Sequence, residues 1–110
     1  MSQRDSEPYI VLGRLLLELE SALQRTGLWE ATKPDAKSLA SQQPFCVDTL
    51  GFHQWLQFVF IPNFEQMIAQ QIPLPHQCQV APMAEEMLKD ASEVIEIVSS
   101  IDALLTNGLQ

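Results

Sequence analysis

The sequence has few positive charges, and they are unevenly placed. Six Lys and Arg residues stand against 14 Asp and Glu residues in a chain of 110, so the formal net charge is −8 and the isoelectric point is near 4.4. Between Ser38 and Leu88 there is no Lys or Arg. Nucleic acid and anionic membranes should repel such a chain, because no basic stripe can neutralise their phosphates. We therefore expect no direct nucleic-acid contact and no membrane contact. The acidity serves either solubility or a basic partner.

Cysteine, glycine and long apolar runs are also scarce. The two cysteines, Cys46 and Cys78, are too few for a disulfide framework and follow no metal or redox spacing, so they predict free thiols in a reducing compartment. The longest nearly apolar run, 58–62, is far shorter than a membrane span, and residues 1–8 lack the apolar core of a secretory signal. Four glycines exclude collagen-like and linker sequences. These absences predict a cytoplasmic protein.

The sequence does contain enough apolar material for one core. Hydrophobic residues make up 46% of the chain and charged residues 18%, which argues against a disordered chain. The length predicts a single helical domain over residues 1–110, with 1–6 as a frayed tail. No alternating strand pattern and no internal repeat occurs in the sequence, so the predicted fold class is all-α.

Residues 9–23 carry a regular apolar stripe. Their large apolar side chains recur every three or four positions, which is typical of one face of an amphipathic helix. Ser6 suits the N-cap position, and Gly27 suits the left-handed position that ends many helices. We predict a helix over about 7–26.

The central segment, about 50–71, is apolar on nearly every side, which is typical of a buried helix. Asp48 or Thr49 can cap its start. Pro62 removes one backbone hydrogen bond and clashes with the preceding turn. We therefore predict that the second helix is central and kinked at Pro62.

Two further helices are predicted in the C-terminal part. The connection at 72–80 contains two closely spaced prolines and cannot be helical. A short helix should follow over 82–89. The last helix, about 91–106, has a clear apolar stripe, and Asp90 is placed to cap it, with Glu93 three residues further on. Together the segments predict a compact bundle of about four helices.

The loop at 27–48 is long, and its apolar side chains favour packing against the bundle. On a helical wheel, Phe58 and Ile61 lie on the far side of the central helix and need cover. We expect the loop to fold over them as a small second core, with Trp29 or Phe45 as the main contact. If the loop is open instead, the region becomes an apolar groove for a partner. The residues of this candidate partner groove are Phe45, Trp55, Phe58 and Ile61.

Side chains that could carry out chemistry are present, but their spacing does not favour a site. His53 and His76 follow no zinc-binding motif. Glu85 and Glu86 would point about 100° apart on a helix, which is typical of a solvated face. Cys46 and His53 lack an electropositive setting that would generate a thiolate. We expect no metal, no cofactor and no catalytic residue, and therefore no enzyme.

Several short motifs match a known family in order and spacing. They are Gln43-Pro44-Phe45, Asp48-Thr49, Trp55-Leu56-Gln57, Ile61-Pro62, Leu74-Pro75 and Val80-Ala81-Pro82. Over residues 5–106 the chain resembles the YqcC-like family of small bacterial proteins. The resemblance implies an all-α bundle and a cytoplasmic protein of proteobacterial type, and it implies no activity. Some members carry a name linked to a tRNA pseudouridine synthase, but this chain is too small for that enzyme and lacks the basic surface it would need.

Two functions remain open on these grounds. The first is a non-enzymatic protein-interaction or accessory domain that binds a protein partner or forms a homodimer. The alternative is an auxiliary factor that acts with a tRNA-modifying enzyme, a pseudouridine synthase, through a protein contact rather than by gripping RNA. The identity of a partner recovered from the cell would separate the two hypotheses.

Overall fold

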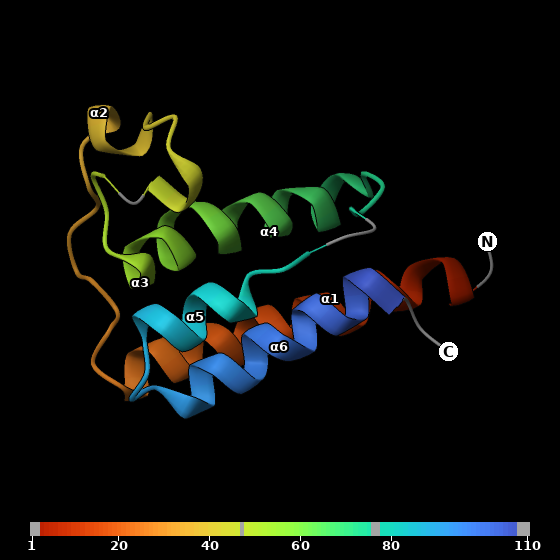
Figure 1. Ribbon diagram of the computed structural model, residues 1–110. Helices are drawn as coiled ribbons and strands as arrows, with labels where there is room; N and C mark the ends of the chain where they lie inside the picture. Colours follow the sequence, from red (N-terminus) through yellow and green to blue (C-terminus); the bar gives the residue numbers. More distant parts are fainter. Residues whose placement is uncertain (1–2, 47, 76–77, 108–110) are drawn as a thin grey trace.

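The computed structural model describes residues 3–46, 48–75 and 78–107, and every regular element in these ranges is helical (Figure 1). In chain order the elements are α1 (Gln3–Arg25), α2 (Ala36–Leu39), η1 (Pro44–Cys46), α3 (Phe52–Trp55), η2 (Leu56–Phe60), α4 (Ile61–Gln70), α5 (Ala81–Met87) and α6 (Ser92–Asn107). Helices α1 and α6 lie side by side, α5 packs on α6, and α4 packs on α1. The prediction of an all-α fold is confirmed.

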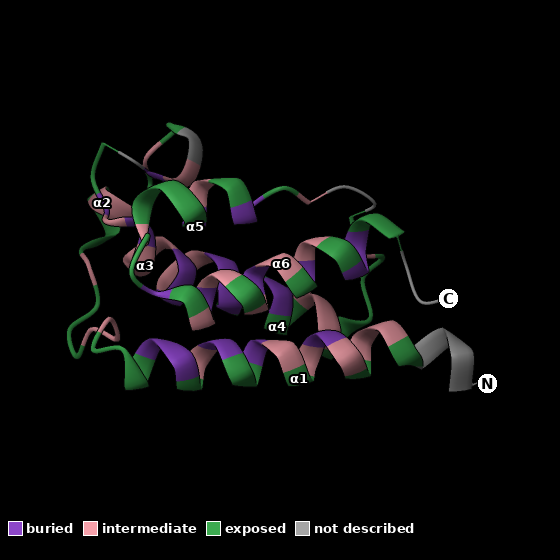
Figure 2. Cartoon of the chain, turned by 60° about the horizontal axis from the view of Figure 1, so that its bottom comes forward, coloured by how far each residue is buried: buried purple, intermediate pink, exposed green. Residues whose placement is uncertain are grey.

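The core lies where the apolar stripes of α1, α4 and α6 meet. Figure 2 shows buried residues on the inward sides of these helices. The buried stripes consist of Leu12, Leu16, Leu19 and Leu23 in α1, and of Val94, Val98, Ile101 and Leu105 in α6. Both stripes follow the helical period. Burying each of these side chains adds about 1.5–3 kcal/mol to the stability of the folded state, compared with leaving it exposed to water. Burial of these stripes therefore holds the first and last helices together.

Helix α1 ends in a Schellman motif at the glycine that the sequence indicates. Gly27 adopts the left-handed conformation, with φ at 76°. The N–H of Leu28 donates to the carbonyl of Leu23 at 2.9 Å, and the N–H of Gly27 donates to the carbonyl of Gln24 at 3.2 Å. These bonds satisfy carbonyls that would otherwise have no partner at the helix end.

Helix α1 begins earlier than the predicted residue 7, so Ser6 lies within the helix and is not its N-cap, whereas the frayed tail stays a prediction. The helix starts at Gln3 and carries Pro8 inside it. Proline lacks the N–H that would reach the carbonyl of Arg4, and one lost hydrogen bond close to a helix end is a small cost. The helix therefore continues on the N-terminal side of the proline.

The central helix begins at Phe52, and the predicted caps Asp48 and Thr49 are wrong. Gly51 is the N-cap, and its N–H donates to Oε1 of Gln54 at 2.8 Å. The Thr49 hydroxyl instead donates to a carbonyl in α2 at 2.7 Å, and the Asp48 carboxylate accepts a hydrogen bond from a serine hydroxyl of the same loop. Both side chains form hydrogen bonds within the loop and do not cap the helix, so the helix starts further along the chain.

One π turn, η2, precedes Pro62 in the central helix. The N–H of Ile61 reaches the carbonyl of Leu56, five residues back. Proline has no N–H to donate, and its ring crowds the carbonyl of Phe58, so a wider turn at this point accommodates both effects. The segments α3, η2 and α4 follow one another directly, and the kink at Pro62 stays a prediction.

The π turn also changes which side chains face the core. It adds about one residue to the turn, which rotates the helix after it by about 100° relative to a regular α-helix. Ile61 is only 4% exposed and lies in the core, whereas Phe58 is partly buried. The predicted second core is therefore wrong for Ile61, because the helical wheel assumed an uninterrupted α-helical period.

Helix α6 begins one residue later than predicted, and Asp90 is not its cap. The N–H of Ile95 donates to the carbonyl of Ala91 at 3.0 Å, which makes Ala91 the N-cap. Ala91 is buried in the core, so packing determines where this helix starts. The Glu93 carboxylate pairs with Arg25 at the end of α1 rather than completing a capping box.

Candidate functional site

The loop at 27–48 is held on the central helix by a buried amide. The side chain of Gln57, 7% exposed, accepts a hydrogen bond from the N–H of Glu30 at 2.8 Å and donates one to the carbonyl of Glu30 at 2.9 Å. The Glu30 carboxylate also lies 3.1 Å from Nε2 of His53. The loop therefore packs on the helix as predicted, and this polar anchor adds to the apolar contacts that Trp29 and Phe45 make with the core.

Phe45 joins this loop to a row of aromatic rings on the central helix. Its ring centroid lies 4.9 Å from that of Trp55 in an edge-on arrangement, and Trp55 stacks on Phe52 at 5.7 Å. The row continues from Trp55 to Phe60 at 5.4 Å and on to Phe64 at 5.0 Å. Phe45 has φ at 57°, which is costly for a residue with a side chain. The aromatic contacts compensate for this cost and hold the ring in place.

One side of the aromatic row borders an apolar cavity of about 370 Å³. It is lined by Phe45, Trp55, Phe60, Asn63, Phe64, Met67, Cys78, Gln79 and Val80, and we call it the aromatic groove. Its walls come from η1, from the central helix and from the chain that leads into α5. Its volume falls within the range of about 300–1,000 Å³ that is typical of ligand pockets.

Two of the four residues predicted for a partner groove line this cavity. Phe45 and Trp55 belong to the lining, whereas Ile61 is buried in the core and Phe58 lies outside the lining. The lining residues of the central helix recur every three to four positions, from Phe60 through Phe64 to Met67. Their helical spacing in the sequence could therefore have revealed this wall. The wall from residues 78–80 could not be found this way, because no local pattern brings that connection to the helix.

Asp102 of α6 holds the chain segment that forms this second wall. Its Oδ2 accepts hydrogen bonds from the N–H groups of Val80 and Ala81 at 2.8 and 2.7 Å. Its Oδ1 is buried and has no hydrogen-bond partner among the described residues. Burial, with a smaller contribution from a hydrogen bond to Asp102, raises the pKa of the Cys78 thiol to about 12. The thiol is therefore protonated near neutral pH and is a poor nucleophile.

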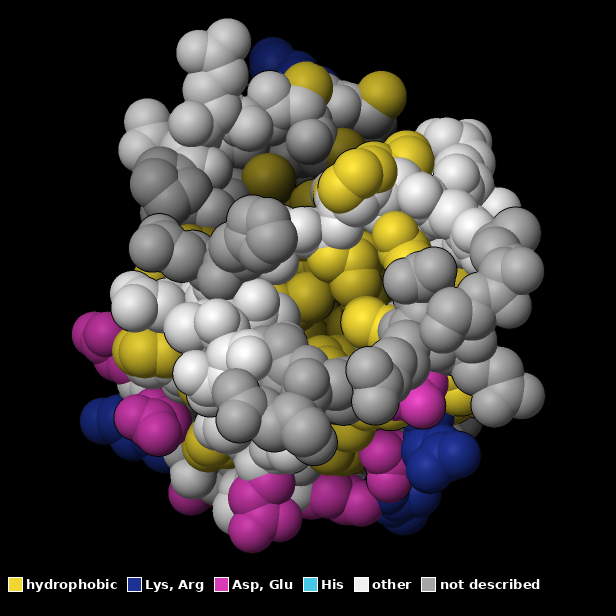
Figure 3. All heavy atoms as spheres, turned by 90° about the vertical axis from the view of Figure 1, so that its right-hand side faces the viewer, with side chains coloured by type: hydrophobic (Ala, Val, Ile, Leu, Met, Phe, Trp, Pro, Cys, Tyr) yellow, Lys and Arg dark blue, Asp and Glu magenta, His cyan; other side chains and the backbone are white. Residues whose placement is uncertain are grey.

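The aromatic groove lies in the acidic part of the chain. Its lining residues fall between positions 45 and 80, inside the stretch 38–88 that contains no Lys or Arg. Asp48, Glu65 and Asp102 belong to the segments that form or support its walls. Figure 3 shows hydrophobic side chains gathered in a hollow on the end face of the molecule, with acidic and basic side chains together to one side of it.

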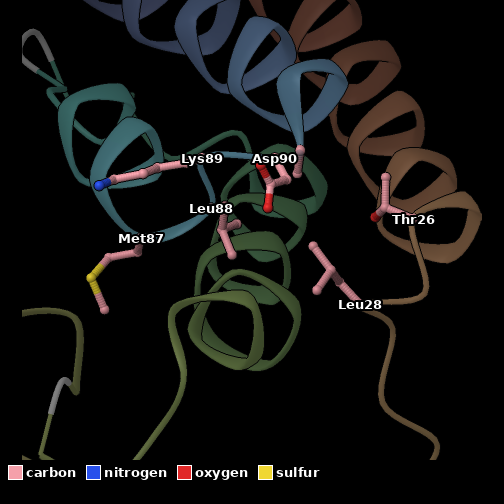
Figure 4. A pocket seen from close by; sticks show the side chains of 7 residues that line it. Thr26, Leu28, Met87, Leu88, Lys89 and Asp90 are labelled. Atoms are coloured by element: carbon pink, nitrogen blue, oxygen red, sulfur yellow. The ribbon is translucent and has the colours of Figure 1, made fainter.

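A second, smaller cavity of about 260 Å³ lies where α1 ends and α6 begins. Its lining consists of Thr26, Leu28 and residues 87–91. Figure 4 shows Leu28, Leu88 and Asp90 turned toward this space. Met87 and Lys89 point away from it. This cavity is smaller than the aromatic groove and its lining is more polar, so the aromatic groove is the stronger candidate site.

Groups with catalytic or metal-binding chemistry are dispersed. Among residues 3–46, 48–75 and 78–107, no three His, Cys, Asp or Glu side chains come together as a metal site, and His76 lies outside these ranges. Glu85 and Glu86 are both exposed on α5, and Cys46 is a buried free thiol. Within the same ranges, no helix combines the length and apolarity that crossing a bilayer requires.

The fold and the groove define a small all-α protein with an apolar surface cavity. A family model described as "tRNA pseudouridine synthase C" (DUF446) matches residues 12–105. The chain belongs to this family, which is the YqcC-like family that its motifs indicate.

Relatives of similar length support the assignment. An uncharacterized protein of Haemophilus influenzae is 32% identical over 89 residues, which cover 81% of this chain and 84% of that protein. The uncharacterized protein YqcC of Escherichia coli is 37% identical over 76 residues, which cover 68% of this chain and 70% of that protein. The solution NMR structure of E. coli YqcC matches with a TM-score of 0.81 and 27% identity, covering 94% of this chain and 92% of that one.

A longer relative carries an enzyme's name. The tRNA pseudouridine synthase C of Pectobacterium carotovorum is 32% identical over 60 residues, which cover 54% of this chain but only 16% of that protein. Most of that protein therefore lies outside the region of similarity.

Proposed function

We propose that the chain is a single helical domain of the cytoplasm that binds a protein partner in the aromatic groove and catalyses no reaction itself. The observation that carries this proposal is the cavity with aromatic walls, because such walls are typical of surfaces that recognise peptides and helices. The protonated thiol of Cys78 offers no nucleophile there. Free thiols at Cys46 and Cys78 suit a reducing compartment.

Asn63 is the lining residue at which partner binding is best tested. It is exposed, so its replacement should leave the core intact. Asn63→Arg places a long charged side chain at an apolar contact, and we expect partner binding to weaken by roughly tenfold or more, because burying that charge against apolar side chains of the partner costs free energy. Ala69→Arg is the matched control, since it adds the same charge on an exposed, non-lining position of the same helix.

The measurement is capture of proteins from a lysate of the source bacterium by the immobilised chain, with quantitative mass spectrometry. We expect a partner that binds wild type and Ala69→Arg and is depleted on Asn63→Arg. Equal capture by all three proteins would contradict the groove as the binding site. If the chain captures only itself, and sedimentation shows a dimer, the partner is a second copy rather than another protein.

A second candidate function is that of an auxiliary factor for a tRNA pseudouridine synthase. The family description and the Pectobacterium protein favour it, because a segment similar to this chain occurs within a much longer protein that carries the synthase name. A small segment inside a long enzyme is consistent with a domain that works beside the catalytic part.

This second function is tested with the purified synthase C of the same bacterium. We expect the chain to bind that enzyme in isothermal titration calorimetry and to change its rate of pseudouridine formation in tRNA, and we expect the chain alone to form none. Asn63→Arg should lose the binding, and Ala69→Arg should keep it. Absence of binding at concentrations of about 10⁻⁵ M would exclude a stable complex with this enzyme.

A further inference from the structure

We infer that the aromatic groove takes a cationic amphipathic segment of the partner, with large apolar side chains inside the groove and Lys or Arg beside them. This inference rests on the proposed function and adds the chemistry of the occupant. It follows from three features of the described residues: the lining of the groove, the distribution of charge around it and the polar groups at its edge.

The lining favours large apolar side chains. The rings of Trp55, Phe60 and Phe64 form a continuous wall, with neighbouring centroids 5.4 and 5.0 Å apart. Met67 extends this wall along α4, and flexible methionine side chains adapt to different apolar shapes. A volume of about 370 Å³ is near the lower end of ligand pockets, so it accommodates a few side chains rather than a large cofactor.

The charge around the groove favours a cationic occupant. From residue 38 to the end of the chain there are eight carboxylates and a single basic residue, Lys89. Asp102 of α6 bonds to the groove wall at the N–H of Val80, whereas Glu93 of the same helix pairs with Arg25. Apolar walls screen charges poorly, so a carboxylate beside the groove acts on its contents more strongly than it would across bulk water. An anionic segment or a nucleic acid would be repelled by the same field.

The edge of the groove supplies polar groups without a positive charge. Asn63 and Gln79 are both exposed and line it. Their amides can bond to the backbone of an occupant, and the faces of Trp55 and Phe45 can attract a nearby cation. A segment with large apolar side chains on one face and basic side chains beside them would satisfy both kinds of surface.

The experiment uses two synthetic peptides of about four helical turns that share the same Leu positions. One peptide carries Lys at the exposed positions between the Leu residues, and the second carries Glu at the same positions. Isothermal titration calorimetry measures the binding of each peptide to the full chain, to Asn63→Arg and to Ala69→Arg. The two variants carry the same net charge, so they separate binding in the groove from general attraction to an acidic protein. Circular dichroism checks that both variants are folded.

We expect the Lys peptide to bind wild type and Ala69→Arg at least roughly tenfold more tightly than the Glu peptide does, with the preference shrinking as salt rises from about 0.05 to 0.5 M. Asn63→Arg should lose this binding. Equal affinity for both peptides, no binding of either, or equal weakening by both substitutions would overturn the inference. If the natural partner is still captured by wild type and lost by Asn63→Arg, the proposed function survives that result. If Asn63→Arg has no effect on capture, both fail.

Discussion

At the residue scale, a few polar side chains decide how the parts of the chain meet. Gln57 satisfies both backbone groups of Glu30, and Asp102 satisfies the N–H groups that start α5. Both side chains act across long distances in sequence. A buried donor or acceptor that loses its partner costs more than the hydrogen bond itself contributes, so these residues should be sensitive to substitution.

Gln57→Leu should therefore destabilise the protein by about 1–3 kcal/mol, because it leaves the N–H and the carbonyl of Glu30 without their partner. Urea unfolding followed by circular dichroism measures the change. Gln66→Leu, at an exposed position of α4, is the control and should change stability by less than about 0.5 kcal/mol. Equal midpoints for Gln57→Leu and wild type would show that the loop does not depend on this amide.

Cys78 should make folding sensitive to alkaline pH. Its thiol has an ordinary pKa of 9.0, and burial raises the pKa to about 12 in the folded protein. The folded state thus holds this proton more tightly, so the contribution to stability is complete below pH 9 and is lost as the pH rises toward 12. We expect the urea midpoint of wild type to fall more steeply over this range than that of Cys78→Ala. Parallel curves for the two proteins would contradict a raised thiol pKa.

At the element scale, helix ends and one irregular turn determine which faces meet. The Schellman motif ends α1 cleanly, whereas packing sets the start of α6 at Ala91. The π turn before Pro62 brings Ile61 into the core. The π turn changes the direction of the side chains that follow it by a large angle, because one residue corresponds to about 100° around a helix.

Gly13 inside α1 and Gly27 just after its end should respond in opposite directions to the same substitution. Gly27→Ala should destabilise the protein by about 1 kcal/mol, since the left-handed conformation at φ 76° is strained for alanine although its Cβ would meet nothing within 4 Å. Gly13→Ala should stabilise by about 0.5–1 kcal/mol, because its Cβ would only touch Ile68 at 3.8 Å inside a regular helix. Thermal unfolding measures both, and the same sign for both would contradict this reading.

The start of α5 should depend on a carboxylate from α6. Asp102→Ala should destabilise by about 1–3 kcal/mol, because two N–H groups at Val80 and Ala81 lose a charged acceptor. Asp90→Ala is the matched control. Asp90 is exposed and is not the N-cap of α6, so its removal should cost less than about 0.5 kcal/mol. A larger loss at Asp90 in urea unfolding would restore it as a cap.

At the scale of the whole molecule, the charge distribution limits the possible partners. The net charge is −8, and the stretch 38–88 has no positive side chain. The aromatic groove is lined entirely by residues of this stretch, and none of them is positively charged. We therefore expect any role near tRNA to depend on a protein contact.

The isolated chain should have no affinity for tRNA at physiological salt. The release of counterions from phosphates supplies most non-specific affinity, and this chain lacks the basic groups that would produce it. A gel-shift titration with purified tRNA measures the binding. A salt-dependent complex of the isolated chain with tRNA would refute the prediction and would point to a direct role on RNA.

The candidate site was predictable only in part. Phe45 and Trp55 were found because aromatic density stands out in a sequence. Ile61 was misplaced because a helical wheel assumes a constant period, and one π turn breaks it. Cys78 and Val80 were missed because the connection before α5 has no periodic pattern, and Asp102 brings it to the groove from a distant helix.

Features that depend on local interactions could be predicted from the sequence alone. The apolar stripes of α1 and α6, the end of α1 at Gly27 and the acidic second half all follow from neighbouring residues, because helical period, left-handed glycine and charge are local properties. Three other features are visible only in the three-dimensional structure: the loop anchor at Gln57, the start of α6 at Ala91 and the composition of the aromatic groove. Each of these depends on groups far apart in the chain, and packing brought them together because the buried surface outweighs local capping preferences.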